Sequence, residues 1–171
     1  MSNKIFFSID NGVSGSLGFI HPDGKASFYL TPIKKCLNYT KVARYVNRID
    51  VFKLKEIITN ELKEERNVIC ALERPMINPT RFQASLSAIR ALEATLVVLE
   101  ELKIPYCYID SKEWTKILPS GLEGSEQLKA ASLDIGKRLF PDLSPMFKKD
   151  ADGILIAEYL RQKENKPTKK L

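Results

Sequence analysis

The chain has 171 residues, 44% of them hydrophobic, and its 27 Lys and Arg against 21 Asp and Glu give a formal net charge of +6. This length predicts one domain with a sizeable core, and the positive charge suits a polyanionic partner. A single histidine and three cysteines without paired spacing argue against a histidine-based metal site, a Ser/His triad and a disulfide framework. With no signal-peptide pattern and no membrane-length apolar run, we expect an intracellular, cytoplasmic protein without membrane contact.

The N-terminal stretch predicts a β-hairpin whose first strand ends on an acid. Ile5–Ile9 is a strand-length run rich in β-branched and aromatic residues, Asp10 follows it, and Leu17–Ile20 can pair back antiparallel after a glycine-rich turn. A carboxylate at the end of a buried strand needs a partner. Two interpretations of Asp10 stay open here: an Asx-type cap of the turn, or a metal ligand at the edge of a rigid sheet.

Strands and helices alternate through the rest of the chain. Residue patterns predict strands at Ala26–Leu30, Asn67–Glu73 and Ile104–Asp110, and helices at Val51–Leu62, Arg81–Leu102, Ser111–Leu118, Ser125–Leu139 and Asp150–Gln162. Asp50 and Ser125 are the expected N-caps of two of these helices. A meander followed by alternating elements predicts an α/β fold with a mixed sheet of about five strands flanked by helices. We assign residues 1–162 to this domain and residues 163–171 to a basic, disordered tail.

The long helix, Arg81–Leu102, is more apolar than one core-facing stripe requires. The stripe predicted to face the sheet is Leu86, Ile89, Leu92, Leu96 and Leu99. Small apolar residues widen this surface and would face water in a single chain, namely Ala84, Ala88, Ala91 and Val98. We therefore expect this helix to lie near the two-fold axis of a homodimer; packing of the final helices onto it is the alternative.

Basic and aromatic residues are interleaved after the third strand, in a segment without an acid before Asp50. Its cations are Lys34, Lys35, Lys41, Arg44 and Arg48, and its aromatic residues are Tyr39 and Tyr45. Such a segment can contact phosphates with its cations and bases or sugars with its rings. A solvated, lysine-rich connection is the other interpretation, and both stay open.

Acids recur at the ends of predicted elements. Asp10 and Glu73 end strands, and Asp150 and Asp152 open the last helix. Taken singly, each has an ordinary role as a turn cap, an ion-pair partner of Arg74 or a helix cap. Together, three or more carboxylates at one edge of a sheet make an oxygen-rich site that suits Mg²⁺ or Mn²⁺. Two such ions can hold a phosphodiester for in-line attack by water.

These residues resemble a known family. Ser8-Ile9-Asp10-Asn11-Gly12, Glu73-Arg74-Pro75, Asp110-Ser111-Lys112-Glu113-Trp114 and Ala151-Asp152-Gly153-Ile154-Leu155 are similar, in order and spacing, to motifs of the RuvC-like Holliday junction resolvases of phages and organelles. The resemblance covers nearly the whole chain. It implies a ribonuclease H-like fold, a homodimer, and divalent-metal cleavage of four-way DNA junctions by paired nicks that leave ligatable 5′-phosphate ends.

The resemblance assigns catalysis and metal binding to Asp10, Glu73 and Asp152, with Asp150 as a fourth candidate. Asn11 stands where the family often has Pro, and Lys148 and Lys149 stand where its fourth acid is usual. Residues two apart in a helix point to nearly opposite sides, so Asp150 can share the site only at or before the N-cap. The expected nucleic-acid contacts are Lys34, Lys35, Lys41, Arg44, Arg48, Arg74, Arg81, Lys112, Lys116, Lys148 and Lys149.

Three other functions are compatible with the pattern. An actin-like ATPase also begins with a strand, an acid and a hairpin, but it needs two such domains to enclose its nucleotide. A catalytically impaired nucleic-acid-binding module of the same fold would explain the missing fourth acid. A nuclease of this fold could also act on other branched DNA, such as flaps.

Overall fold

The computed structural model describes residues 3–63 and 65–165. Its strands are β1 (Ile5–Ile9), β2 (Ser16–Ile20), β3 (Ala26–Leu30), β4 (Ile33–Leu37), β5 (Tyr45–Ile49), β6 (Val68–Glu73) and β7 (Tyr106–Ile109). Its α-helices are α1 (Val51–Leu62), α2 (Phe82–Glu101), α3 (Ser111–Trp114), α4 (Gly124–Leu139) and α5 (Asp152–Asn165). Short 3₁₀ helices lie at Pro79–Arg81, Thr115–Ile117 and Pro141–Met146.

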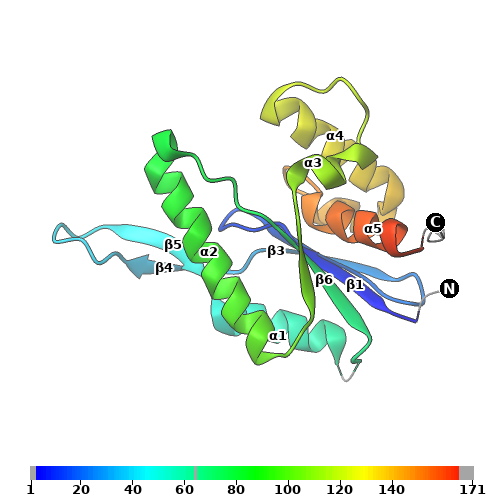
Figure 1. The fold of residues 1–171 in the computed structure, drawn as a ribbon, viewed down its shortest axis with the longest axis horizontal. Coiled ribbons are helices and arrows are strands. Elements are labelled where there is room, and N and C mark those ends of the chain that lie inside the picture. Colours follow the sequence, from blue (N-terminus) through cyan, green and yellow to red (C-terminus); the bar gives the residue numbers. More distant parts are fainter. Residues whose placement is uncertain (1–2, 64, 166–171) are drawn as a thin grey trace, which may run out of the picture.

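The main sheet has five strands in the order β3-β2-β1-β6-β7 (Figure 1). β1, β2 and β3 form an antiparallel meander, whereas β1, β6 and β7 run parallel. The parallel strands are joined through helices, as parallel connections require. The predicted mixed five-stranded α/β sheet is therefore confirmed.

Helices cover both faces of this sheet. α1 and α2 lie on one face, and α3, α4 and α5 lie on the other (Figure 1). All five residues of β1 are buried: Ile5, Phe7 and Ile9 pack into the core under α1 and α2, whereas Phe6 packs into the core under α5. This two-sided burial explains why β1 is apolar at every position except Ser8, and it fixes the end of β1 rigidly.

A second, two-stranded sheet was not predicted. β4 and β5 form an antiparallel hairpin within the basic segment, and it extends away from the main sheet (Figure 1). The half-buried positions of β4 are Lys34 and Cys36, while Ile33 and Leu37 are exposed. Because apolar residues face solvent and a lysine faces inward, the usual strand alternation is inverted and gave no signal.

The predicted core face of α2 is partly wrong. Ala91 and Val98, expected to face water, are buried together with Thr95 and Leu99, whereas Ile89, expected in the core, is 47% exposed. The smaller side chains of Ala91 and Thr95 suit close packing of the helix on the core, and Ile89 is left on the outer side. The helix therefore still presents an apolar outer surface, but a different one from that predicted.

The start of α4 and the end of α5 also differ from the prediction. The N-cap of α4 is Glu123 rather than Ser125, and the Glu123 N–H donates to Gln127 Oε1 at 2.9 Å. The Asp50 cap of α1 is confirmed. α5 continues to Asn165, so the first residues of the predicted tail are helical; residues 166–171 of that tail lie outside the described residues.

Within residues 3–63 and 65–165, one helical segment, Pro79–Glu101, is long and apolar enough to cross a membrane by length and composition alone. The sequence prediction that no run reaches this length is corrected on that point. Core helices of soluble proteins meet the same criterion, and here the segment contributes Ala91, Val98 and Leu99 to the core beneath the sheet.

Candidate active site

Asp10 and Glu73 lie at the ends of two neighbouring parallel strands. β1 and β6 pair with Ile9 opposite Leu72, so the next residue of each chain segment reaches the same edge of the sheet. Both side chains are half-buried, and the Glu73 carboxylate adjoins that of Asp10. The register of two buried strands thus brings together two carboxylates that are 63 positions apart in the sequence.

Close backbone packing holds the start of α5 against the sheet. A Cβ on Gly18 of β2 would lie 2.3 Å from Ile154 Cα, so a larger residue there would push α5 away. The Gly153 N–H donates to Ser16 Oγ at 3.0 Å, and the Ser8 hydroxyl donates to the Gly153 carbonyl. These contacts fix the first turn of α5 over β1 and β2, and they place its first residue beside the end of β1.

Asp150 joins this site from outside the helix. α5 begins at Asp152, so Asp150 lies before the helix rather than two residues along it. One carboxylate oxygen each of Asp10, Asp150 and Asp152 lies within 4.8 Å of the others. Asp150 therefore lies before the helix, as it must if it is to share the site with Asp152. Asp10, Glu73, Asp150 and Asp152 together form the carboxylate cluster.

Ionising all the carboxylates of the cluster is unfavourable in free energy when no cation lies between them. Burial, followed by the charges of Glu73, Asp152 and Asp150, raises the pKa of Asp10 well above its usual value. Burial is also the main reason that the pKa of Asp152 is raised to about 6. The hydrogen bond from Ser132 lowers this pKa, whereas the charges of Asp150 and Glu73 raise it further. Like charges packed this closely favour either a proton or a positive ion between them.

Two neighbouring side chains orient members of the cluster. The buried Ser132 hydroxyl of α4 donates to the Asp152 carboxylate and accepts from the Ala151 N–H at 3.1 Å. The Trp114 indole N–H donates to Glu73 Oε1 at 2.7 Å. Sequence reasoning noticed Trp114 only as part of a motif and missed Ser132, although a serine between apolar helical positions was a usable signal.

Two lysines approach Asp150. Lys129 Nζ lies 3.8 Å and Lys149 Nζ 3.9 Å from Asp150 Oδ2. Lys149 was predicted to contact nucleic acid, whereas Lys129 of α4 was missed because it lies 21 positions away in the sequence. Both lysines are partly exposed at this edge, where they could meet an incoming anion, and Lys148 beside them is exposed.

The remaining predicted nucleic-acid contacts spread over several surfaces. Arg74 pairs with Asp110 at 3.1 Å and stacks on Tyr108 at 5.0 Å, so its charge is partly engaged. Lys34, Lys35, Lys41, Arg44 and Arg48 belong to the β4–β5 hairpin and its turn, whereas Arg81, Lys112 and Lys116 are exposed at the start of α2 and around α3. The predicted acids therefore lie close together at one edge of the sheet, whereas the predicted cations are spread over several surfaces of the protein.

The donor set fits a hard divalent cation. Carboxylate oxygens are the ligands that Mg²⁺ and Mn²⁺ prefer, and the histidines and thiolates that favour zinc do not belong to the cluster. Asp10, Asp150 and Asp152 would hold such an ion, and Glu73 beside Asp10 could share it or hold a second one. The raised pKa values of Asp10 and Asp152 are the second sign that this site is built around positive charge.

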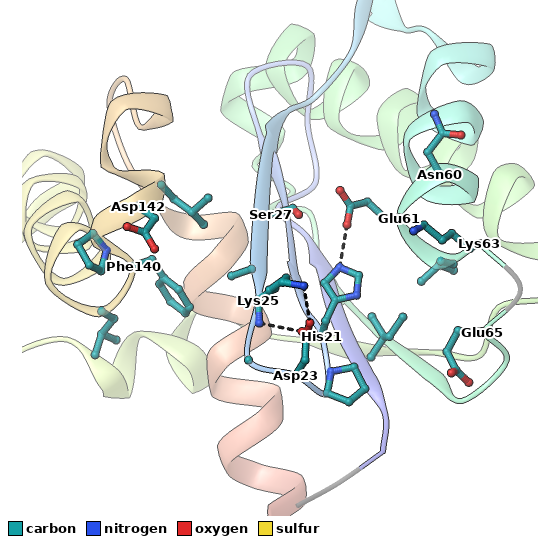
Figure 2. Close-up of a pocket in the computed structure, with 18 residues that line it drawn as sticks. His21, Asp23, Lys25, Ser27, Asn60, Glu61, Lys63, Glu65, Phe140 and Asp142 are labelled. Carbon is teal, nitrogen blue, oxygen red and sulfur yellow. Dashed lines mark hydrogen bonds and ion pairs between the residues drawn. The ribbon is translucent and has the colours of Figure 1, made fainter.

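A cavity of about 1060 Å³ lies at the opposite end of the sheet from the carboxylate cluster (Figure 2). Four of its polar side chains form two pairs: His21 Nε2 lies 2.8 Å from Glu61, and Lys25 pairs with Asp23 at 2.9 Å. Burial and the Glu61 carboxylate, which accepts its hydrogen bond, raise the pKa of Tyr29 to about 12. Because its histidine and its Glu61 are engaged with each other, and among the described residues this cavity gathers no cluster of acids like that around Asp10, it is a weaker candidate for chemistry than the carboxylate cluster.

Comparison with known proteins identifies the fold. No protein-family model and no curated protein sequence matches the chain. Among solved structures, T. thermophilus RuvC in complex with a Holliday junction substrate matches with a TM-score of 0.59 and 16% identity, over 95% of this chain and 97% of that chain. A second Thermus thermophilus RuvC structure matches with a TM-score of 0.49 and 15% identity, over 94% and 96% of the two chains.

The chain therefore has a RuvC-like fold, an α/β architecture of the ribonuclease H-like type. The likeness extends over nearly the whole of both chains. At this level of identity the match establishes the architecture. The chemistry of the chain has to be argued from its own residues.

Proposed function

We propose that this protein is a metal-dependent endonuclease that cleaves four-way DNA junctions. The single observation that supports the proposal most is the convergence of four carboxylates from β1, β6 and the start of α5 at one edge of a RuvC-like fold. The T. thermophilus protein of this fold was solved with a Holliday junction substrate. The net charge of +6 suits the same kind of polyanionic ligand.

The acids of the carboxylate cluster and the lysines beside it have different roles in this proposal. Asp10, Asp150 and Asp152 would hold one divalent cation on the sheet edge, and Glu73 from the neighbouring strand would hold a second one together with Asp10. Bound Mg²⁺ or Mn²⁺ supplies Lewis acidity toward a phosphodiester and makes water a better nucleophile. Lys129 and Lys149, beside Asp150, are placed to attract the negatively charged phosphate to this edge. The expected products are nicks with ligatable 5′-phosphate ends.

A homodimer is part of the proposal. Resolution of a four-way junction takes two symmetric cuts, which a two-fold enzyme can make on a roughly two-fold substrate. α2 presents Phe82, Ile89 and Val97 with exposed fractions of 66%, 47% and 53%. Exposed apolar side chains of this size on one long helix favour a protein partner, and a second copy of the chain is the partner we propose.

Two alternatives lose support or stay open. The binding module without catalysis was suggested by a missing fourth acid, and Asp150 now occupies the cluster from outside α5. Cleavage of other branched DNA, such as flaps, uses the same chemistry and differs only in substrate geometry.

We place the activity inside the cell, in the cytoplasm, in agreement with three cysteines that form no disulfide among the described residues.

A nicking assay tests the proposal. Synthetic four-way junctions, flaps and linear duplexes labelled on each strand are incubated with the protein in Mg²⁺, Mn²⁺ or EDTA. We expect paired, symmetric nicks in the four-way junction that depend on the metal and that DNA ligase can reseal. Equal cleavage in EDTA, or preference for the linear duplex, would contradict the proposal, while preference for flaps would select the second substrate class.

A further inference from the structure

A groove of about 400 Å³ separates the β4–β5 hairpin from α2. Both of its walls are made of elements outside the carboxylate cluster. The charged and polar residues that line it are Lys34, Asn38, Arg44, Asn47, Arg48, Gln83, Ser87 and Arg90. This hairpin groove combines four cations with amide and hydroxyl groups, and no acid lines it.

The cations of the hairpin groove have no acidic partner among the described residues, although Lys34 Nζ lies 5.7 Å from the centroid of the Phe52 ring. Lys34 and Arg48 are directly opposite each other across β4 and β5, a like-charge pair that destabilises a hairpin. Among residues 3–63 and 65–165, neither of them, nor Arg44 or Arg90, makes an ion pair with an acid. An anion bound between these side chains would remove the repulsion.

Aromatic rings accompany the cations. Tyr39, in the hairpin turn, is 79% exposed and lies under the Arg90 guanidinium, with 5.4 Å between the guanidinium carbon and the ring centroid. Tyr45 lines the groove and is 65% exposed. Cations that contact phosphates beside exposed rings that contact sugars or bases are the combination found in nucleic-acid channels.

The groove is continuous with the turn that holds Asp10. Val13 lines the groove and lies three residues after Asp10 in the same turn. The Asn11 side chain donates to the Ala88 carbonyl of α2 at 3.1 Å, which ties that turn to the wall of the groove. A strand that lies in the hairpin groove would therefore be directed toward the carboxylate cluster.

We propose that the hairpin groove binds the sugar-phosphate backbone of the DNA strand beside the phosphate that is cut. This inference rests on the proposed function, because it identifies where that function holds its substrate. Lys34, Arg44, Arg48 and Arg90 contact successive phosphates, and Tyr39 and Tyr45 contact the sugars or bases between them. A site of this kind recognises backbone charge and is not selective for base sequence.

Binding of a fluorescent four-way junction tests the groove. Anisotropy is measured over a range of NaCl concentrations with proteins that also carry Asp10→Asn, so that cutting does not interfere. Arg48→Ala with Arg90→Ala should weaken binding about 10-fold and reduce the slope of log affinity against log salt by roughly 2. The matched control, Arg66→Ala with Lys137→Ala, removes two exposed cations that do not line the groove and should change affinity less than about 2-fold.

The outcomes separate the groove from the proposed function. Equal losses in the groove and control variants would overturn the groove, even if the wild-type protein cuts junctions. Salt-dependent binding that Arg48→Ala with Arg90→Ala removes, without any cleavage by the wild type, would overturn the nuclease and keep the groove. Thermal melting checks that each variant folds; if the double variant does not, Tyr39→Ala and Arg44→Gln on the exposed hairpin decide the same question by the same measurement.

Discussion

The carboxylate cluster and the hairpin groove place opposite charges in opposite surroundings. The acids are half-buried or buried, and strand register and the close packing of α5 fix their positions. Burial, together with the neighbouring negative charges, raises the pKa of Asp10 and of Asp152. The cations line the groove between the hairpin and α2, with Arg44 and Arg48 exposed and Lys34 and Arg90 half-buried, so solvent partly screens them. Rigid, enclosed charge suits chemistry at one phosphate, and screened, spread charge suits binding along a backbone.

The largest effect is expected from removal of one buried charge. Asp10→Asn, Glu73→Gln and Asp152→Asn should each reduce junction cleavage by at least about 10³-fold, because each removes an oxygen ligand from the site. Junction binding should stay near that of the wild type, because binding depends on cations elsewhere. Cleavage and anisotropy on the same junction measure the two effects, and full activity of Asp10→Asn would contradict the assignment.

A second prediction concerns the side chains that orient the cluster. Trp114→Phe keeps the ring but removes the N–H that Glu73 accepts, and it should raise the Mg²⁺ requirement or lower the cleavage rate by about 10- to 100-fold. Ser132→Ala should act similarly on Asp152. The test is cleavage rate against Mg²⁺ concentration.

Trp114 is the only tryptophan of the chain, so its fluorescence in the wild type should also change as Mn²⁺ binds beside Glu73. Lys137→Ala, on the outer side of α4, serves as a control that keeps every cluster contact. A wild-type metal requirement in Trp114→Phe, together with unchanged fluorescence in the wild type, would show that the indole does not support the site.

The outer face of α2 tests assembly independently of both charged sites. Ile89→Glu and Val97→Glu place charges on exposed positions, so they should leave the fold intact and weaken dimerisation at least about 10-fold. Ala91→Glu would not serve, since Ala91 is only 2% exposed and belongs to the core. Sedimentation at micromolar concentration measures the assembly, with Leu139→Glu on α4 as a control. A wild-type monomer that cuts both strands in one encounter would refute the dimer.

The smallest expected effect is on stability against pH. Between the ordinary value of 3.8 and about 6, the folded protein holds more protons on Asp152 than the unfolded chain, so its free energy of unfolding falls as pH rises through this window. The raised pKa of Asp10 acts in the same direction. In EDTA, Tm should fall by roughly 3 °C more between pH 5 and pH 7.5 in the wild type than in Asp152→Asn. A Tm difference of the opposite sign would contradict the burial argument.

The sequence predicted those parts of the molecule where local pattern and tertiary structure agree. β1, apart from Ser8, and β6 up to Glu73 are apolar because both faces of the sheet are covered, and the acids that end these runs therefore stood out. The alternation of strands and helices predicted that these acids meet at one edge of a mixed sheet, whereas the parallel pairing of β1 with β6, which puts Asp10 beside Glu73, came from the structure. The place of Asp150 depended on where α5 begins, a matter of two residues, which a sequence pattern does not resolve.

Other features depend on contacts that no local pattern encodes. The inner face of α2 is set by small residues that let it pack closely, so its largest side chains misled the prediction. The β4–β5 hairpin has a lysine inside and leucine outside, which conceals a strand. Ser132 and Lys129 reach the cluster from α4, about 20 positions before the acids that they contact, through the fold alone.

The most direct test of the central claim is Mn²⁺ binding to the protein itself, measured from the electron paramagnetic resonance signal of the free ion. The wild-type protein should bind Mn²⁺ at the carboxylate cluster, roughly two ions per protomer. Asp10→Asn with Asp152→Asn should abolish this binding, while Arg48→Ala with Arg90→Ala should leave it at the wild-type level. Equal Mn²⁺ binding by the wild type and by Asp10→Asn with Asp152→Asn would show that the buried acids do not form the metal site.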